Sequence, residues 1–266
     1  MQLSPYSWRD GDQTHEFHLA HVPGTNGEPY VFGVGANQRS IDVSDFFMST
    51  TPITQAFWAH VMGSNPSVRP DLRCPVENVS WHHVTDPGGF LDRLNTSAVL
   101  AAIAGGDRTR RFRLPSETEW EYAARGGPHW RDGYRFSGSN DVRAVAWSGP
   151  LWSGGRLKWN LLKQLKRLGV PIGGGPTRTH DIATKASNQL GLYDMSGNVW
   201  EWCQDTCTDD LDAIPRDGTP WLGPGDERRL RGGCHHNWDI FCTVSWRYGI
   251  VADAHDGCIG FRVVLA

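Results

Sequence analysis

Glycine and proline break this chain into short pieces, and this feature limits its folds more than any other. The 266 residues include 31 glycines and 16 prolines, together with 13 tryptophans. Glycine and proline disfavour helix interiors and favour turns, whereas tryptophan buries a large area wherever it packs. A chain of this length can bury the core of one large domain. We therefore expect a single domain over residues 1–266, with short strands and long loops held by tryptophans, and not a helical bundle.

Charge and hydropathy exclude several classes of protein. The formal net charge of −3 gives no positive surface of the kind that binds nucleic acid. No apolar run is long enough to cross a bilayer, and the N-terminus lacks the basic start and apolar stretch of a signal peptide. We therefore expect no nucleic-acid partner, no membrane span and a cytoplasmic location, in which the six cysteines would stay mostly reduced.

Turn residues and helix caps place the first elements. Residues 17–24 (FHLAHVPG) and 30–35 (YVFGVG) alternate in the manner of hairpin strands between glycine and proline. The segment TPITQAFWAHVMG predicts a helix, because Thr51 or Thr54 can cap its start and Gly63 can end it.

The clearest helix lies in LPSETEWEYAARGG. Ser116 and Glu119 form a capping box at its start, and we expect it to end near Arg125. Glu117 and Glu121 lie one turn apart and could form a catalytic carboxylate pair. Acidic residues in a first turn are explained more simply by the helix dipole, so we favour that interpretation.

Six blocks of the sequence carry a family resemblance. PVENVSW, FLDRLN, FRLPSETEWEYAARGG, GLYDMSGNVWEW, RLRGG and GFRVV stand in this order between about Phe17 and the last residue. Together they resemble the formylglycine-generating enzyme (sulfatase-modifying factor) family. The resemblance implies an α+β, C-type-lectin-like fold with an antiparallel core sheet, two main helices and much irregular structure. It also implies that residues 232–264 return to the core sheet and build a ligand site.

The same resemblance bears on copper. The formylglycine-generating members bind copper through two cysteines five positions apart that follow the RGG element, and soft thiolates suit Cu(I). In this chain the second position is Cys242, but the first is Asn237. Copper is therefore not expected. The enzymatic alternative, a copper oxidase acting on a protein cysteine or another family oxidoreductase, would need Cys234 to act with Cys242.

Other metals have weaker support from the spacing of residues. His235 and His236 would point to opposite faces of an extended strand, so they should not share an ion. Cys234 and His236 could share one if a further ligand came from elsewhere, the candidates being Cys242, Asp239 and His255. No established zinc spacing supports this, so we favour surface or packing roles.

A calcium site is implied by the block GLYDMSGNVWEW. In relatives this turn supplies two side-chain and two backbone oxygens, which correspond here to the carboxylates of Asp194 and Glu201 and the carbonyls of Gly197 and Val199. Such hard oxygen ligands suit Ca²⁺, which would be structural and not catalytic. The alternative is that Asp194 caps the turn and Glu201 pairs with an arginine.

Two segments depart from the family pattern. Residues 149–188 form a basic insertion, in which residues 157–168 predict an amphipathic helix that could dock a partner or pack on its own domain. Residues 86–89, Asp-Pro-Gly-Gly, should break the helix that relatives start at Ser80.

The segment from Cys234 to Cys258 has the composition of a recognition surface. It contains no Lys, Glu, Gln or Met. In some members of the family that the chain resembles, a diversity-generating retroelement rewrites adenines in the codons of this segment, and such rewriting favours a composition of this kind. We therefore predict a domain that binds a protein or other macromolecule, with Arg231, Val244, Ile259 and Phe261 as buried anchors. The expected ligand contacts, mostly exposed and on one face, are His235, His236, Trp238, Asp239, Phe241, Trp246, Tyr248 and His255.

Overall fold

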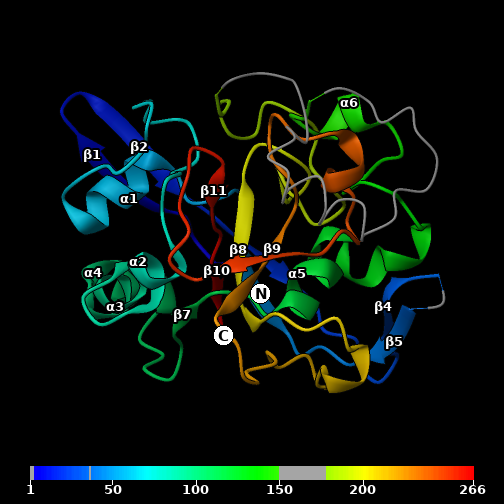
Figure 1. Ribbon diagram of the computed structural model, residues 1–266. Coiled ribbons are helices and arrows are strands. Elements are labelled where there is room, and N and C mark those ends of the chain that lie inside the picture. Colours follow the sequence, from blue (N-terminus) through cyan, green and yellow to red (C-terminus); the bar gives the residue numbers. More distant parts are fainter. Residues whose placement is uncertain (1–2, 36, 150–177) are drawn as a thin grey trace.

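Two four-stranded sheets and six α-helices form the fold in a computed structural model that describes residues 3–35, 37–149 and 178–266. Figure 1 shows β8 near the centre, with α1–α4 on one side and α5 and α6 on the other. The mixed α+β class with much irregular structure confirms the expectation from the glycine and proline pattern.

The first sheet has the strand order β10-β9-β8-β11. The pairs β10–β9 and β9–β8 are antiparallel, whereas β11 runs parallel to β8. Its members are β8 (Trp200–Thr206), β9 (Glu227–Arg231), β10 (Tyr248–Val251) and β11 (Ile259–Gly260).

The second sheet has the order β3-β6-β12-β7 and is antiparallel throughout. Its members are β3 (Leu19–Val22), β6 (Phe46–Ser49), β12 (Val264–Leu265) and β7 (Phe112–Arg113). Val264 pairs with Met48 on one side and Arg113 on the other, so the C-terminal strand lies inside this sheet. The segment after β9 is therefore fixed at both ends, and its predicted return to the sheets is confirmed.

Two hairpins complete the strands. They are β1 (Tyr6–Asp10) with β2 (Gln13–Phe17), and β4 (Tyr30–Val34) with β5 (Asn37–Ile41). The predicted strands at residues 17–24 and 30–35 correspond to β3 and β4.

The two helices whose caps were predicted, α1 and α5, begin and end at the expected residues. Thr54 caps α1 (Gln55–Met62), and Gly63 ends it with a φ of 77°, a left-handed conformation that favours glycine. Ser116 and Glu119 form the capping box of α5 (Glu117–Ala124), which ends at Arg125. The other helices are α2 (Trp81–Thr85), α3 (Phe90–Thr96), α4 (Ala98–Ala104) and α6 (Val142–Val145), with 3₁₀ turns η1 (Gly127–Asp132), η2 (Leu211–Ala213) and η3 (Asp239–Cys242). Residues 86–89 separate α2 from α3, so the predicted break is confirmed.

Buried tryptophans join the sheets to the loops. Trp202 on β8 is fully buried and donates its indole N–H to the carbonyl of Val79 at 2.9 Å. Trp120 on α5 is also fully buried and donates to a carboxylate of β8, that of Glu201, at 2.6 Å. Each indole thus combines a large apolar contact with a satisfied donor, which lets irregular segments pack tightly.

The predicted amphipathic helix at residues 157–168 lies outside the described residues. Among the helices that the structure does describe, none has the length and apolar character needed to span a membrane.

Candidate functional site

Buried ion pairs attach the C-terminal segment to α5. Glu117 accepts from both Nε and Nη2 of Arg247, each at 2.7 Å, and lies 3.1 Å from Nε of Arg229. Glu121 pairs with Arg231 at 2.5 Å and with Arg125 at 2.7 Å. Burial alone would raise the pKa of Glu117, but the charges of Arg229, Arg247 and Arg231 outweigh it and lower this pKa to about 2. The negative charges of Glu117 and Glu121 are therefore balanced by arginines, and both side chains have a structural role. This pairing explains the two glutamates without a catalytic pair and without the helix dipole.

Arg231 carries this attachment into the middle of the segment. Its guanidinium donates to the carbonyl oxygens of Val244 at 2.7 Å and Trp246 at 2.8 Å. Arg231, Val244, Ile259 and Phe261 are all buried, as expected of the four anchors. The segment is thus held at its start, its middle and its end.

Between these anchors, large apolar side chains are partly exposed. Trp238, Trp246 and Tyr248 are half-buried, as are two residues that we did not expect, Ile240 and Ile250. All five pack against the same hydrophobic cluster beneath them. Tyr248 and Ile250 alternate along β10, which places these two on one face of the strand. We call these five residues the aromatic surface.

Three of the predicted ligand contacts are buried, which corrects the sequence-based expectation for them. Phe241 is buried because it packs between Trp238, whose ring lies stacked at 6.1 Å, and Trp246, whose ring meets it edge-on at 4.8 Å. Asp239 is buried at the start of η3, 3.7 Å from Arg135, and His235 is buried with Nδ1 at 2.9 Å from the carbonyl of Asn198. These three side chains support the surface and do not form part of it.

The two remaining histidines lie in different places. His236 is half-buried beside Cys234. His255 is exposed, hydrogen-bonds with Asn78 at 2.9 Å and lies 5.9 Å from the His83 ring. It therefore neighbours α2 and not the aromatic surface.

The copper positions of the family contain no thiol pair. Asn237, at the first position, is buried, and its side-chain oxygen accepts the Cys234 N–H at 3.2 Å and lies 3.0 Å from the Cys234 sulfur. Cys242, at the second position, is buried in a small apolar cluster with Phe136 and Val142, and burial raises the pKa of its thiol. Its sulfur lies 4.0 Å from the carbonyl oxygen of Cys234. Cys242 thus resembles an inert packing residue.

A tight turn brings Asp194 close to Glu201. Asp194, Gly197 and Asn198 all have left-handed φ values, of 55°, 82° and 65°. One oxygen of buried Asp194 accepts the N–H of Ala183 at 2.8 Å. Burial, with a smaller contribution from the charge of Glu201, raises the pKa of Asp194 to about 6. Two buried carboxylates therefore lie near one another with incomplete compensation.

Glu201 has the arginine partner that we considered as the alternative to calcium. Arg262 donates to both carboxylate oxygens, at 2.7 and 2.9 Å, and Trp120 donates to one of them. An ionised carboxylate offers about four acceptor sites, so Glu201 has one acceptor site left after these three hydrogen bonds. The second oxygen of Asp194 has only a 3.5 Å contact, with the side-chain amide of Asn198. The arginine pairing is therefore present, and the two carboxylates keep acceptor positions of the oxygen type that calcium uses.

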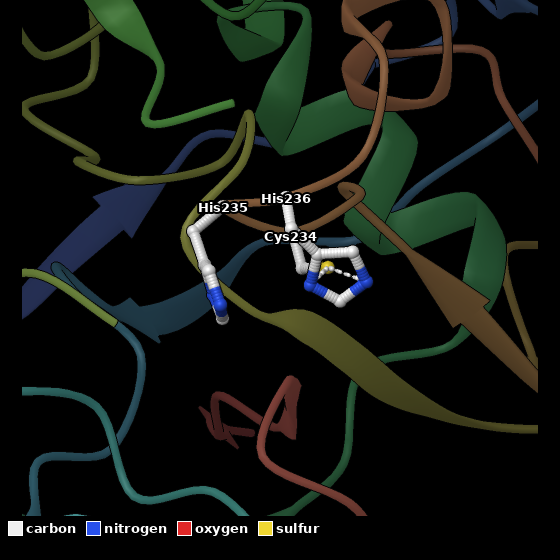
Figure 2. Close-up of side chains that lie close together, drawn as sticks. All are labelled: Cys234, His235 and His236. Atoms are coloured by element: carbon white, nitrogen blue, oxygen red, sulfur yellow. Dashed lines mark hydrogen bonds between the residues drawn. The ribbon is translucent and has the colours of Figure 1, made fainter. Parts of the chain in front are cut away.

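A turn, and not a strand, follows Cys234. The Asn237 N–H donates to the Cys234 carbonyl at 3.0 Å, so the chain reverses over these four residues. The expectation that His235 and His236 point apart is therefore wrong: their ligand nitrogens and the Cys234 sulfur all lie within 4.8 Å of one another. Figure 2 shows the three side chains extending from this turn, with the Cys234 sulfur against the His236 ring.

The sequence of this chain is similar to those of several known proteins. The model of the sulfatase-modifying factor enzyme 1-like domain matches residues 13–266. The chain is 30% identical over 194 residues to "Chaperone protein LppX" of Paenibacillus barcinonensis, covering 63% of this chain and 64% of that protein. It is 31% identical over 211 residues to the formylglycine-generating enzyme of Streptomyces coelicolor, covering 78% and 57%. The match thus spans less than two thirds of the length of either relative.

Among solved structures, Treponema denticola variable protein 1 superimposes with a TM-score of 0.72. The two chains are 26% identical, and the match covers 98% of each. The likeness to PvdO from Pseudomonas aeruginosa has a TM-score of 0.64 at 19% identity, which shows a shared fold alone.

Proposed function

Because this chain belongs to the sulfatase-modifying factor enzyme 1-like family, which holds proteins named as a chaperone and as an enzyme, we propose a function from its own site. The chain is a recognition domain that binds a protein or another macromolecule through the aromatic surface. One observation carries this proposal: five large apolar side chains stay partly exposed between buried anchors. Exposed apolar groups gathered on one face of a folded domain are typical of binding sites.

The aromatic surface lies between buried anchors, which suits a segment whose sequence can change. The anchors are held by ion pairs and core packing, so the residues between them can change without loss of the frame. The Treponema denticola relative is itself named a variable protein. We propose that residues 234–258 are a segment of this kind, with the aromatic surface as its variable part. A second copy of its DNA beside the gene, altered only at adenines, would mark rewriting by a retroelement.

The alternative function is copper-dependent oxidation of a protein cysteine. A copper-binding assay distinguishes it from recognition. The reduced protein should bind no Cu(I) at Cys242 with affinity above that of the Cys242→Ser variant, and should form no aldehyde on a cysteine-containing peptide. The reason is that Cys242 is a buried thiol whose family partner position holds Asn237, which offers no second soft ligand for Cu(I).

The variant Asn237→Cys is the matched control, because it restores two cysteines five positions apart. It should gain Cu(I) binding that is lost again in the double variant with Cys242→Ser. Aldehyde formation by the unmodified protein, abolished by Cys242→Ser, would replace recognition by oxidation as the function.

We propose in addition that Ca²⁺ binds as a structural ion. The carboxylates of Asp194 and Glu201 and the carbonyls of Gly197 and Val199 would hold it, and the ion would place positive charge beside the buried carboxylate of Asp194. Its role would be to stabilise the turn before β8 and not to take part in chemistry. Thermal unfolding with calcium or with a chelator tests this proposal.

A further inference from the structure

A second cysteine, from the far end of the segment, joins the Cys234 turn. The side chain of Cys258 interacts with the thiol of Cys234 and with the imidazole of His236. The Cys234 sulfur in turn lies 3.5 Å from Nδ1 of His236 and 3.9 Å from its Nε2. Cys234, His235 and His236 have their ligand atoms within 4.8 Å of one another. Cys258, which is 24 positions from Cys234 in sequence and precedes β11, adds a second sulfur that interacts with Cys234 and His236.

His235 offers a fourth ligand whose orientation is already set. Its Nδ1 lies 2.9 Å from the backbone oxygen of Asn198, and a carbonyl can only accept, so Nδ1 carries the proton. Nε2 then keeps its lone pair. Metal-binding histidines commonly have this arrangement, in which one ring nitrogen is tied to a carbonyl and the other faces the ion.

Burial favours a closed site. Cys234, His235 and Cys258 are 0%, 3% and 7% exposed, and only His236 is half-buried. A bound ion would thus have little contact with water and no open position for a substrate. This is the character of structural zinc sites, in which four nitrogen and sulfur ligands complete a tetrahedron.

We propose that Cys234, Cys258, His235 and His236 bind one Zn²⁺ ion. Binding replaces the protons of the two thiols, which leave as two H⁺ while the thiolates become ligands. The ion joins residue 234 to residue 258, the two ends of the proposed recognition segment, and so closes that segment at its base. This site uses none of the aromatic surface and neither of the family's copper positions, 237 and 242.

One other cluster in the described part of the chain has comparable ligands. Asp71, Cys74 and Asp181 also bring their ligand atoms within 4.8 Å of one another. It contains a single thiol, and Asp71 is exposed. Zn²⁺ prefers the site with two thiols and two imidazoles, so Cys74→Ser serves as the control for binding elsewhere.

The test uses the reduced protein freed of metal by a chelator. Zn²⁺ should bind at one equivalent, and Co²⁺ in its place should give the thiolate charge-transfer absorption and intense visible bands of tetrahedral coordination. Loss of an outer-shell partner alone lowers zinc affinity by about 10–100-fold, so Cys258→Ser should lower it by about 100-fold or more. His236→Ala, which removes a half-buried side chain, should also weaken binding and should alter the Co²⁺ spectrum without unfolding the chain.

Cys74→Ser and Cys242→Ser should leave affinity and spectrum unchanged. The proposal is overturned if Zn²⁺ does not bind at one equivalent, if Cys258→Ser and His236→Ala both bind as tightly as the parent, or if binding is lost in Cys74→Ser. It is also overturned if Cys234 and Cys258 form a disulfide whose reduction restores no zinc binding. None of these results would change the aromatic surface, so the recognition function is tested separately.

Discussion

Replacing Glu117 with glutamine is expected to lower the free energy of unfolding by about 3–5 kcal/mol, which is the cost of removing one partner from a buried ion pair. Glutamine keeps the shape of the side chain but removes the charge. Arg229 and Arg247, whose side chains are 2% and 16% exposed, would lose the charge of Glu117. Arg231 would keep its pairing with Glu121. Urea unfolding of the two proteins measures the difference.

Glu119→Gln is the matched control on the same helix. Glutamine preserves the capping box, and the ion pair that it breaks involves Arg113, whose side chain is 36% exposed. Glu119 is itself buried, but Arg113 can stay hydrated, so we expect a smaller loss than for Glu117, about 1–2 kcal/mol. If Glu117→Gln costs no more than this control, the buried network does not hold the segment to α5.

Acid gives a second readout of the same carboxylate. The pKa of Glu117 is about 2 in the folded protein and about 4.3 in an unfolded chain. Because the folded pKa is the lower one, its contribution to stability is present above about pH 4.3 and is lost as the pH falls through about 2. The stability difference between the parent and Glu117→Gln should therefore shrink below pH 4. A difference that stays constant down to pH 2 would contradict the assigned pairing.

Replacing Glu201 with glutamine is expected to cost a similar amount, about 3–5 kcal/mol, because it leaves Arg262 uncompensated in the centre of the molecule. Arg262 is 0% exposed, and it also donates to the neutral carbonyls of Ser49 and Tyr193, which do not balance its charge. Glu227→Gln, on the exposed start of β9, should change stability by less than about 0.5 kcal/mol. Equal effects of the two variants would show that the Glu201–Arg262 pair does not contribute.

Melting temperatures measured with and without calcium distinguish a role of Glu201 in binding Ca²⁺ from its pairing with Arg262. Ca²⁺ should raise the melting temperature of the parent, EGTA should cancel the rise, and Glu201→Gln should respond to neither. A parent whose melting temperature is the same with Ca²⁺ and EGTA has no calcium site, while the arginine pairing would remain.

Local signals predicted the helices well because each depends on a few adjacent residues. The Ser116–Glu119 capping box, the Thr54 cap and the left-handed Gly63 act within one turn of backbone, so their positions could be predicted from the sequence. The partners of Glu117 could not, since Arg229 and Arg247 follow it by more than 100 positions and are brought to it only by the pairing of β8, β9 and β10.

The candidate site was predicted less well, for a similar reason. Its four anchors were predicted correctly, and two of them, Arg231 and Phe261, lie in family blocks. The turn at Cys234, however, changes which way the next two histidines point. Phe241 and Asp239 are buried by η3, a short 3₁₀ turn that the apolar pattern did not reveal. No spacing rule connects Cys258 with Cys234, because their contact depends on β11 returning beside β8.

Saturation mutagenesis of the C-terminal segment tests the central claim most directly. A displayed library is sorted for folded protein by protease resistance, and the retained residue types are counted at each position. A recognition surface on a fixed frame predicts that most substitutions remain folded at the five positions of the aromatic surface: Trp238, Ile240, Trp246, Tyr248 and Ile250. It also predicts that few remain folded at the buried anchors Arg231, Val244, Ile259 and Phe261, where core substitutions cost about 2–5 kcal/mol. If the five positions prove as restricted as the four anchors, the segment is part of the core and the recognition function is wrong.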